Sequence, residues 1–109
     1  MVRKQIIELS RLGPLPSSEV ALRDHLDGLI AKYEDLLKSI QKPVTNEEAR
    51  ILVTLFSPGD AFGLDWALVH LVESAPGWPL LDCLKNANNE WIQLLRQTAK
   101  NSGMLPSSW

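Results

Sequence analysis

The chain has 109 residues, of which 45% are apolar and 22% are charged. This composition is ordinary for a globular protein, and the length predicts a single domain over residues 1–109. The formal net charge of −2 disfavours a dedicated nucleic-acid binder, and one cysteine excludes an internal disulfide or a zinc site with several cysteine ligands.

Nothing in the sequence has the form of a targeting or membrane-spanning segment. No run approaches the roughly 20 apolar residues that cross a bilayer. Residues 1–11 mix basic and apolar side chains at helical spacing, without the continuous apolar run of a signal peptide. We therefore expect a cytoplasmic protein with no membrane partner.

Proline and glycine divide the chain into helix-length segments, with breaks at residues 13–16, 42–43, 57–59, 75–79 and 103–106. The segment Ser17–Gln41 predicts one long amphipathic helix that a serine at 17 or 18 caps. Its apolar positions lie within about 120° on a helical wheel: Leu22, Leu26, Leu29, Ile30, Tyr33, Leu36, Leu37 and Ile40.

Capping signals predict where the next helices begin. Thr45 and Glu48 have the spacing of a capping box, ahead of the apolar run 51–56. Asp60 is a plausible N-cap for a helix over Ala61–Ser74. Asn88 or Asn89 is expected to cap a final helix with an apolar side made by these residues: Trp91, Ile92, Leu94, Leu95 and Ala99.

Strand signals are poor, because nothing alternates cleanly with a period of two and no Asn-Gly or Asp-Gly turn is present. The sequence therefore predicts an all-α fold, a single compact bundle of five or six helices.

Charge is distributed unevenly along this bundle. Residues 51–84 contain four acidic residues, Asp60, Asp65, Glu73 and Asp82, and no Lys or Arg. One interpretation of this uneven distribution is chance, because so few charges are involved. The functional interpretation is an acidic surface that steers association with a basic partner.

Aromatic residues lie within the same acidic stretch. On the expected helix 61–74, apolar residues from Phe62 to Val72 cover most of the circumference, which predicts a central helix. Trp66 shares the remaining narrow polar side with His70 and Glu73. Trp78 follows on a stiff Gly-Trp-Pro loop. A tryptophan in either place is packed under a neighbouring helix or exposed as a contact anchor. The candidate partner-binding residues are Asp60, Asp65, Trp66, His70, Glu73, Trp78 and Asp82.

Catalytic and metal chemistry find little support. His70 and Glu73 have the i, i+3 spacing found in some metal clusters, but such sites need matching ligands on other helices. Cys83, among leucines, is typical of a buried structural thiol. The phosphate-binding, nucleophile-elbow and metalloprotease motifs are all absent. We expect no enzyme activity, no catalytic residues, no metal and no cofactor.

Residues 55–79, LFSPGDAFGLDWALVHLVESAPGWP, resemble a segment of small bacterial immunity proteins, as does the helix that begins with Asn89-Glu90-Trp91. Those proteins protect cells against polymorphic or contact-dependent growth inhibition toxins. The resemblance covers about a third of the chain. It implies a cytoplasmic protein that binds a cognate toxin domain, often a nuclease with a basic cleft, and blocks it.

Two other functions remain open from the sequence. A small nucleic-acid-binding regulator would use the polar side of the last helix, where Arg96 and Lys100 are the two bases. A helical adaptor domain would bind some other helical partner.

Overall fold

The structure is a computed structural model that describes residues 2–57, 59, 61–85 and 89–105. Every regular element in these residues is a helix. Over these residues there are six α-helices, two short 3-10 helices and no strand, which confirms the all-α bundle. The elements are α1 (Lys4–Leu12), α2 (Ser18–Arg23), α3 (Asp27–Ser39), α4 (Asn46–Leu52), η1 (Val53–Leu55), α5 (Leu64–Glu73), η2 (Leu81–Leu84) and α6 (Glu90–Asn101).

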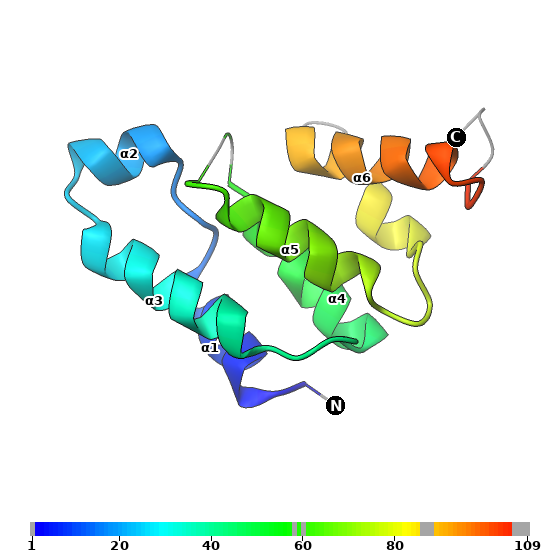
Figure 1. The fold of residues 1–109 in the computed structure, drawn as a ribbon, viewed down its shortest axis with the longest axis horizontal. Helices are drawn as coiled ribbons and strands as arrows, with labels where there is room; N and C mark the ends of the chain where they lie inside the picture. Colours follow the sequence, from blue (N-terminus) through cyan, green and yellow to red (C-terminus); the bar gives the residue numbers. More distant parts are fainter. Residues whose placement is uncertain (1, 58, 60, 86–88, 106–109) are drawn as a thin grey trace.

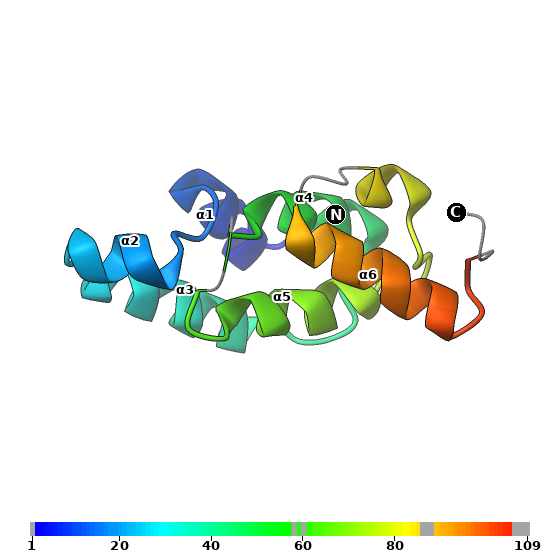
Figure 2. The same cartoon turned by 90° about the horizontal axis from the view of Figure 1, so that it is seen from above.

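The helices pack in two layers (Figures 1 and 2). Helices α3 and α5 lie side by side in one layer, and α1 and α4 lie behind them. Helix α6 packs against η2 and α5 at one end, and α2 adjoins α3 at the other. The Cα atoms extend over 42 × 29 × 17 Å. The smallest dimension corresponds to two helix layers at the usual spacing of about 8–10 Å.

The prediction of one helix over Ser17–Gln41 is wrong, because the chain turns between α2 and α3. His25 has φ 56°, in the left-handed region that ends helical hydrogen bonding. The Leu26 N–H donates across the turn to the Ala21 carbonyl at 2.9 Å. As a result Leu22, predicted on the apolar side, is 63% exposed, whereas Tyr33 and Leu37 further along are buried.

Three of the predicted helix starts are confirmed. Ser17 caps α2, where its Oγ accepts from the Val20 N–H at 3.3 Å. The Glu48 N–H donates to Thr45 Oγ1 at 3.1 Å, and the Thr45 N–H donates to Glu48 Oε1 at 2.9 Å. Asn89 rather than Asn88 caps α6, since its Oδ1 accepts from the N–H groups of Trp91 and Ile92.

The start of α5 differs from its prediction. The helix begins at Leu64, three residues later than expected, and its N-cap is Gly63 with φ 79°. Asp60, the predicted cap, lies outside the described residues. The later start leaves Phe62 outside the helix, in the preceding turn.

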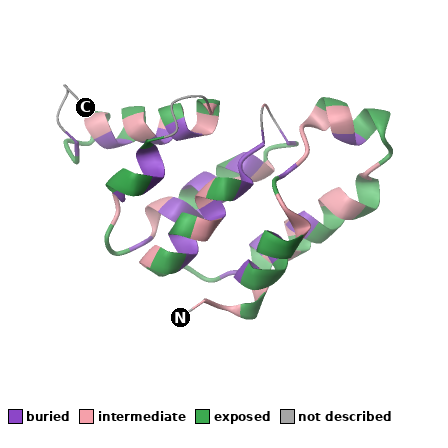
Figure 3. Cartoon of the chain, turned by 180° about the vertical axis from the view of Figure 1, so that it is seen from behind, coloured by how far each residue is buried: buried purple, intermediate pink, exposed green. Residues whose placement is uncertain are grey.

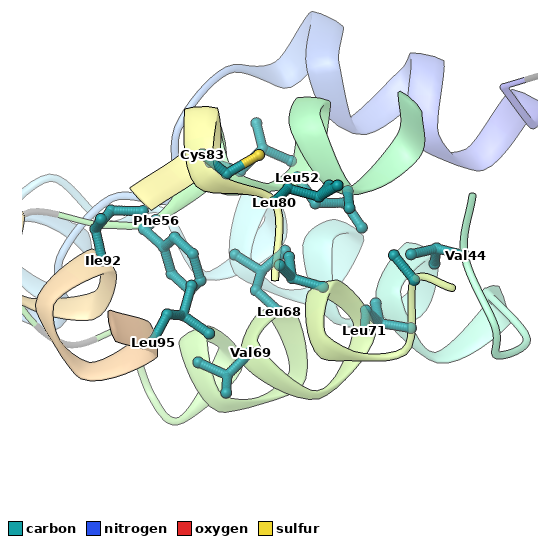
Figure 4. Packing of buried hydrophobic residues seen from close by; sticks show 14 of the residues in the cluster. Val44, Leu52, Phe56, Leu68, Val69, Leu71, Leu80, Cys83, Ile92 and Leu95 are labelled. Atoms are coloured by element: carbon teal, nitrogen blue, oxygen red, sulfur yellow. The ribbon is translucent and has the colours of Figure 1, made fainter. Parts of the chain in front are cut away.

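The core forms where the two layers and α6 meet (Figures 3 and 4). Leu68 and Leu71 of α5 are 1% and 4% exposed, which confirms that this helix is central. Leu68 and Val69 lie close to Phe56 and to Leu95 of α6, with Leu52 of α4 above them. Burial is concentrated on the inward faces of the helices, as Figure 3 shows.

A buried carboxylate joins the N-terminal segment to this core. Glu48, 1% exposed, accepts from the Arg3 N–H at 3.0 Å and from Arg3 Nε at 2.9 Å. Arg3 Nη1 also donates to the Gln41 carbonyl at 2.8 Å. Burial works to raise the pKa of Glu48, but the hydrogen bonds from Arg3 and Thr45 outweigh it and lower this pKa to about 2.

Truncation of Leu68 tests the central position of α5. The Leu68→Ala variant is expected to lose about 2–5 kcal/mol of unfolding free energy, the range for buried leucines. Leu81, 47% exposed, provides the matched control, and Leu81→Ala should lose less than about 1 kcal/mol. Urea denaturation gives both values. A loss below about 1 kcal/mol for Leu68→Ala would show that α5 is peripheral.

Glu48 predicts a pH dependence of stability. Because its folded pKa lies below the ordinary value, its contribution is full above about pH 4.5 and is lost as the pH falls toward about 2. The stability difference between wild type and Glu48→Gln should therefore shrink over that window, by up to about 3 kcal/mol. Urea titrations at stepped pH measure it. A difference independent of pH would contradict the ion-pair assignment.

Candidate functional site: the aromatic surface of helix α5

Asp65 is buried, so its predicted role as a surface contact for a partner is wrong. The residue is 0% exposed. One carboxylate oxygen accepts from the Ser57 N–H at 2.9 Å, and the other accepts from Ser57 Oγ at 2.8 Å and the Ala61 N–H at 3.0 Å. Located in the first turn of α5, the carboxylate also faces the positive end of the helix dipole. Asp65 therefore fixes the loop that leads into α5.

Asp82 lies apart from α5 and is already paired. It is in η2, which Figure 2 shows beside α4 in the rear layer. Arg50 Nε of α4 donates to Asp82 Oδ2 at 2.9 Å, and this hydrogen bond lowers the pKa of Asp82. Asp60 lies outside the described residues. The four acids of the sequence stretch therefore do not form one continuous acidic surface within the described part of the chain.

The remaining α5 candidates do lie on one exposed side of the helix. Trp66, His70 and Glu73 have i, i+4 and i+7 spacing, which places them along one stripe. Trp66 is 49% exposed, His70 is exposed and Glu73 is half-buried. The exposed half of Trp66 is therefore available for contact with a partner, and the rest of the residue is packed.

Helix α6 holds Trp66 in place through a chain of three aromatic rings. Trp66 meets Trp91 edge to face, with ring centroids 5.3 Å apart and an interplanar angle of 86°. Trp91 stacks on Phe56 at 6.1 Å and 11°, and its Nε1 donates to the Gly59 carbonyl at 2.6 Å. This arrangement orients the exposed part of the Trp66 ring in advance of any contact.

Phe62 is a further exposed aromatic that the sequence placed in the core helix. It is 49% exposed and has φ 53°, a conformation that bulky residues rarely adopt. Such a conformation costs on the order of 1–3 kcal/mol. The Phe62 N–H donates to Ser18 Oγ at 3.0 Å, and the Asp65 network fixes the residue before it. Gly63 follows at the N-cap with φ 79°, but the apolar spacing continues through Phe62 into α5, so the helix was predicted to begin before this turn.

Trp78 belongs to the other end of α5. Its loop is bonded to α4, where the Gly77 N–H donates to Asn46 Oδ1 at 2.9 Å. The Trp78 ring is half-buried and packs against the core. The structure thus separates Trp78, which follows the last turn of α5, from Trp66 in the first. We define the aromatic surface as Phe62, Trp66, His70 and Glu73, supported by Trp91.

A metal centre and a reactive thiol are the other two kinds of site to consider in the described residues. Those residues contain no group of three or more His, Cys, Asp or Glu side chains arranged to hold a metal ion. The Cys83 thiol is buried, and burial raises its pKa away from the reactive thiolate form. None of the described helices has the length and apolarity needed to cross a membrane.

Comparison with protein-family models, curated proteins and solved structures finds no significant match for this chain.

Asp65 predicts a sharp loss of stability on a nearly isosteric change. In Asp65→Asn an amide NH₂ replaces one oxygen and faces backbone donors, which leaves a buried donor unpaired. The expected loss is about 1–3 kcal/mol of unfolding free energy. Glu73→Gln, the same kind of change on the exposed side of α5, should change it by less than about 0.5 kcal/mol. Equal stability of the two variants in urea would contradict this account.

Proposed function

We propose that this chain is a non-enzymatic immunity protein that binds and neutralises a cognate bacterial toxin domain in the cytoplasm. The observation that carries the proposal is the half-exposed Trp66 ring, held by an edge-to-face contact with Trp91, together with a second half-exposed aromatic, Phe62, in the turn that precedes the same helix. Exposed, pre-oriented tryptophan is enriched among the residues that dominate protein–protein binding energy. An aromatic so fixed supports a docking role rather than catalysis.

The proposal that the partner is a toxin domain rests on the sequence resemblance. The run 55–79 that resembles immunity proteins builds the Asp65-bonded loop, α5 and the Trp78 loop. The resembling part of the chain is therefore the part that forms the aromatic surface. A nuclease toxin with a basic cleft remains our proposed partner.

The structure changes how the charges contribute to this proposal. Asp65 is buried and Asp82 is paired with Arg50, so neither adds net charge to the aromatic surface. Glu73 is the acid of the predicted set that remains on the exposed side of α5. Aromatic contact, with Glu73 and His70 at the rim, takes the place of the acidic surface as the main basis of binding.

Truncation of Trp66 tests the proposal. Trp66→Ala should weaken binding to the toxin domain encoded beside the gene by about 30-fold or more, mainly through faster dissociation. The loss follows from removing a large, pre-oriented contact area at the centre of the surface. Surface plasmon resonance gives both rates, and growth of cells that produce the toxin gives protection.

The matched control is Ile7→Ala, which truncates a 41% exposed side chain of α1 in the rear layer. It should bind within about twofold of wild type. Both variants are first checked for folding by circular dichroism. Protection by folded Trp66→Ala equal to wild type would overturn the assignment of the surface. Failure of the wild-type chain to protect would overturn the immunity function itself.

A further inference from the structure

A groove runs between α3 and the start of α5, next to the aromatic surface. Two adjoining hollows of about 240 Å³ each form it, and both are lined by Ile30, Glu34 and Phe62. Leu64 and Ala67 of α5 add apolar lining to one, and Ala31 of α3 adds it to the other. The Phe62 ring thus borders both hollows and is half-exposed between them.

The backbone at Phe62 is fixed before any partner arrives. Its left-handed conformation is held from two sides, by Ser18 Oγ of α2 and by the Asp65 carboxylate that binds the Ala61 N–H. Strained residues of this kind cluster at ligand clamps and binding loops. Half of the ring remains exposed, so burial in the core does not account for this conformation.

The charges of the groove favour a basic occupant. Asp27 and Glu34 line it from α3. Among the described lining residues Lys38 is the one base, and its Nζ binds Glu34 Oε1 at 2.7 Å in an exposed pair. The α5 wall brings no positive side chain, because residues 51–84 contain no Lys or Arg. The charged lining residues, Asp27 and Glu34 against Lys38, leave a net charge of −1, and Asp27 has no cation paired with it in the described residues.

We propose that this groove binds an amphipathic segment of the partner protein, with an apolar side chain seated against Phe62 and Lys or Arg side chains beside Asp27 and Glu34. The inference rests on the proposed function and deepens it, because it names the chemistry of the toxin element that docks next to Trp66. Apolar contact anchors the segment and charge sets its register.

An end-blocked amphipathic peptide tests the groove directly. The probe contains lysines on one side and a leucine–phenylalanine pair on the other. Two comparison peptides replace the lysines by glutamates or the apolar pair by serines. Backbone amide NMR shifts of the full chain should move at residues 27–38 and 61–67 with the lysine probe, and binding of both comparison peptides should be weaker by about tenfold or more.

Protein variants make the test specific to the groove. Asp27→Lys/Glu34→Lys should weaken binding of the lysine probe by about tenfold or more at low salt, and by less at high salt. Phe62→Asn removes the ring while keeping a residue that accepts the left-handed conformation, and it should weaken binding similarly. The matched control, Glu47→Lys/Asp82→Lys, makes the same charge change on α4 and η2 in the rear layer, and like Glu34→Lys it breaks one exposed ion pair.

The control should bind the probe within about twofold of wild type. Equal weakening by both charge reversals, or binding of the glutamate peptide as tight as that of the lysine peptide, would overturn the proposal. Growth assays with the same variants distinguish a failure of the groove proposal from a failure of the proposed immunity function. Lost protection by Trp66→Ala with full protection by the groove variants would overturn the groove and keep the immunity function. Probe binding at the groove by a wild-type chain that does not protect would overturn the immunity function and keep the groove.

Discussion

The hydrogen bonds of the Asp65 carboxylate are the interaction on which the aromatic surface depends. At the start of α5, the two carboxylate oxygens accept hydrogen bonds from the Ser57 N–H, the Ser57 hydroxyl and the Ala61 N–H. Three donors of a loop thereby gain a charged acceptor in the interior, where such bonds are strong. The loop conformation that follows places Phe62 in its strained turn and brings the Gly59 carbonyl to the Trp91 indole. The exposed aromatics are thus arranged by one buried acid.

Glu48 plays the corresponding part for the N-terminal half. Its carboxylate caps α4 through Thr45 and receives Arg3, which also bonds to the Gln41 carbonyl. Both acids are therefore used inside the fold, and a charge count along the sequence overstates what reaches the surface. Within residues 51–84, Asp65 is buried and Asp82 is paired with Arg50, so the described part of this stretch does not form an acidic surface. Formal charge says nothing of whether a carboxylate meets solvent or backbone donors.

Sequence reasoning succeeded where the signal is local. The Thr45 capping box and the Asn89 cap need only neighbours within one helical turn, and both are confirmed. The all-α class and the central position of α5 followed from apolar spacing. The break at His25 was missed because neither proline nor glycine stands at that position. The turn at Phe62 was missed although Gly63 follows it, because the apolar spacing continues across the turn. Tertiary hydrogen bonds, such as that from Phe62 to Ser18, stabilise the second turn and leave no local signature.

In the candidate site too, local spacing predicted which residues share a side of α5, but burial depends on tertiary packing and could not be predicted. Helical spacing placed Trp66, His70 and Glu73 on one side of α5, and the structure agrees. Whether Trp66 was buried could not follow from spacing, since that depends on where α6 crosses. Trp91 reaches Trp66 edge-on, so α6 supports the ring without covering it.

An exposed tryptophan held in this way loses little conformational freedom on binding. A flexible surface tryptophan would lose rotamer freedom on contact, whereas this ring is already restrained by Trp91, and Trp91 in turn by Phe56 and Gly59. The same holds for Phe62, whose backbone is fixed by Ser18 and Asp65. The fold therefore maintains two half-exposed aromatics in fixed positions on either side of the first turn of α5. That rigidity favours slow dissociation from a partner whose surface matches the two rings.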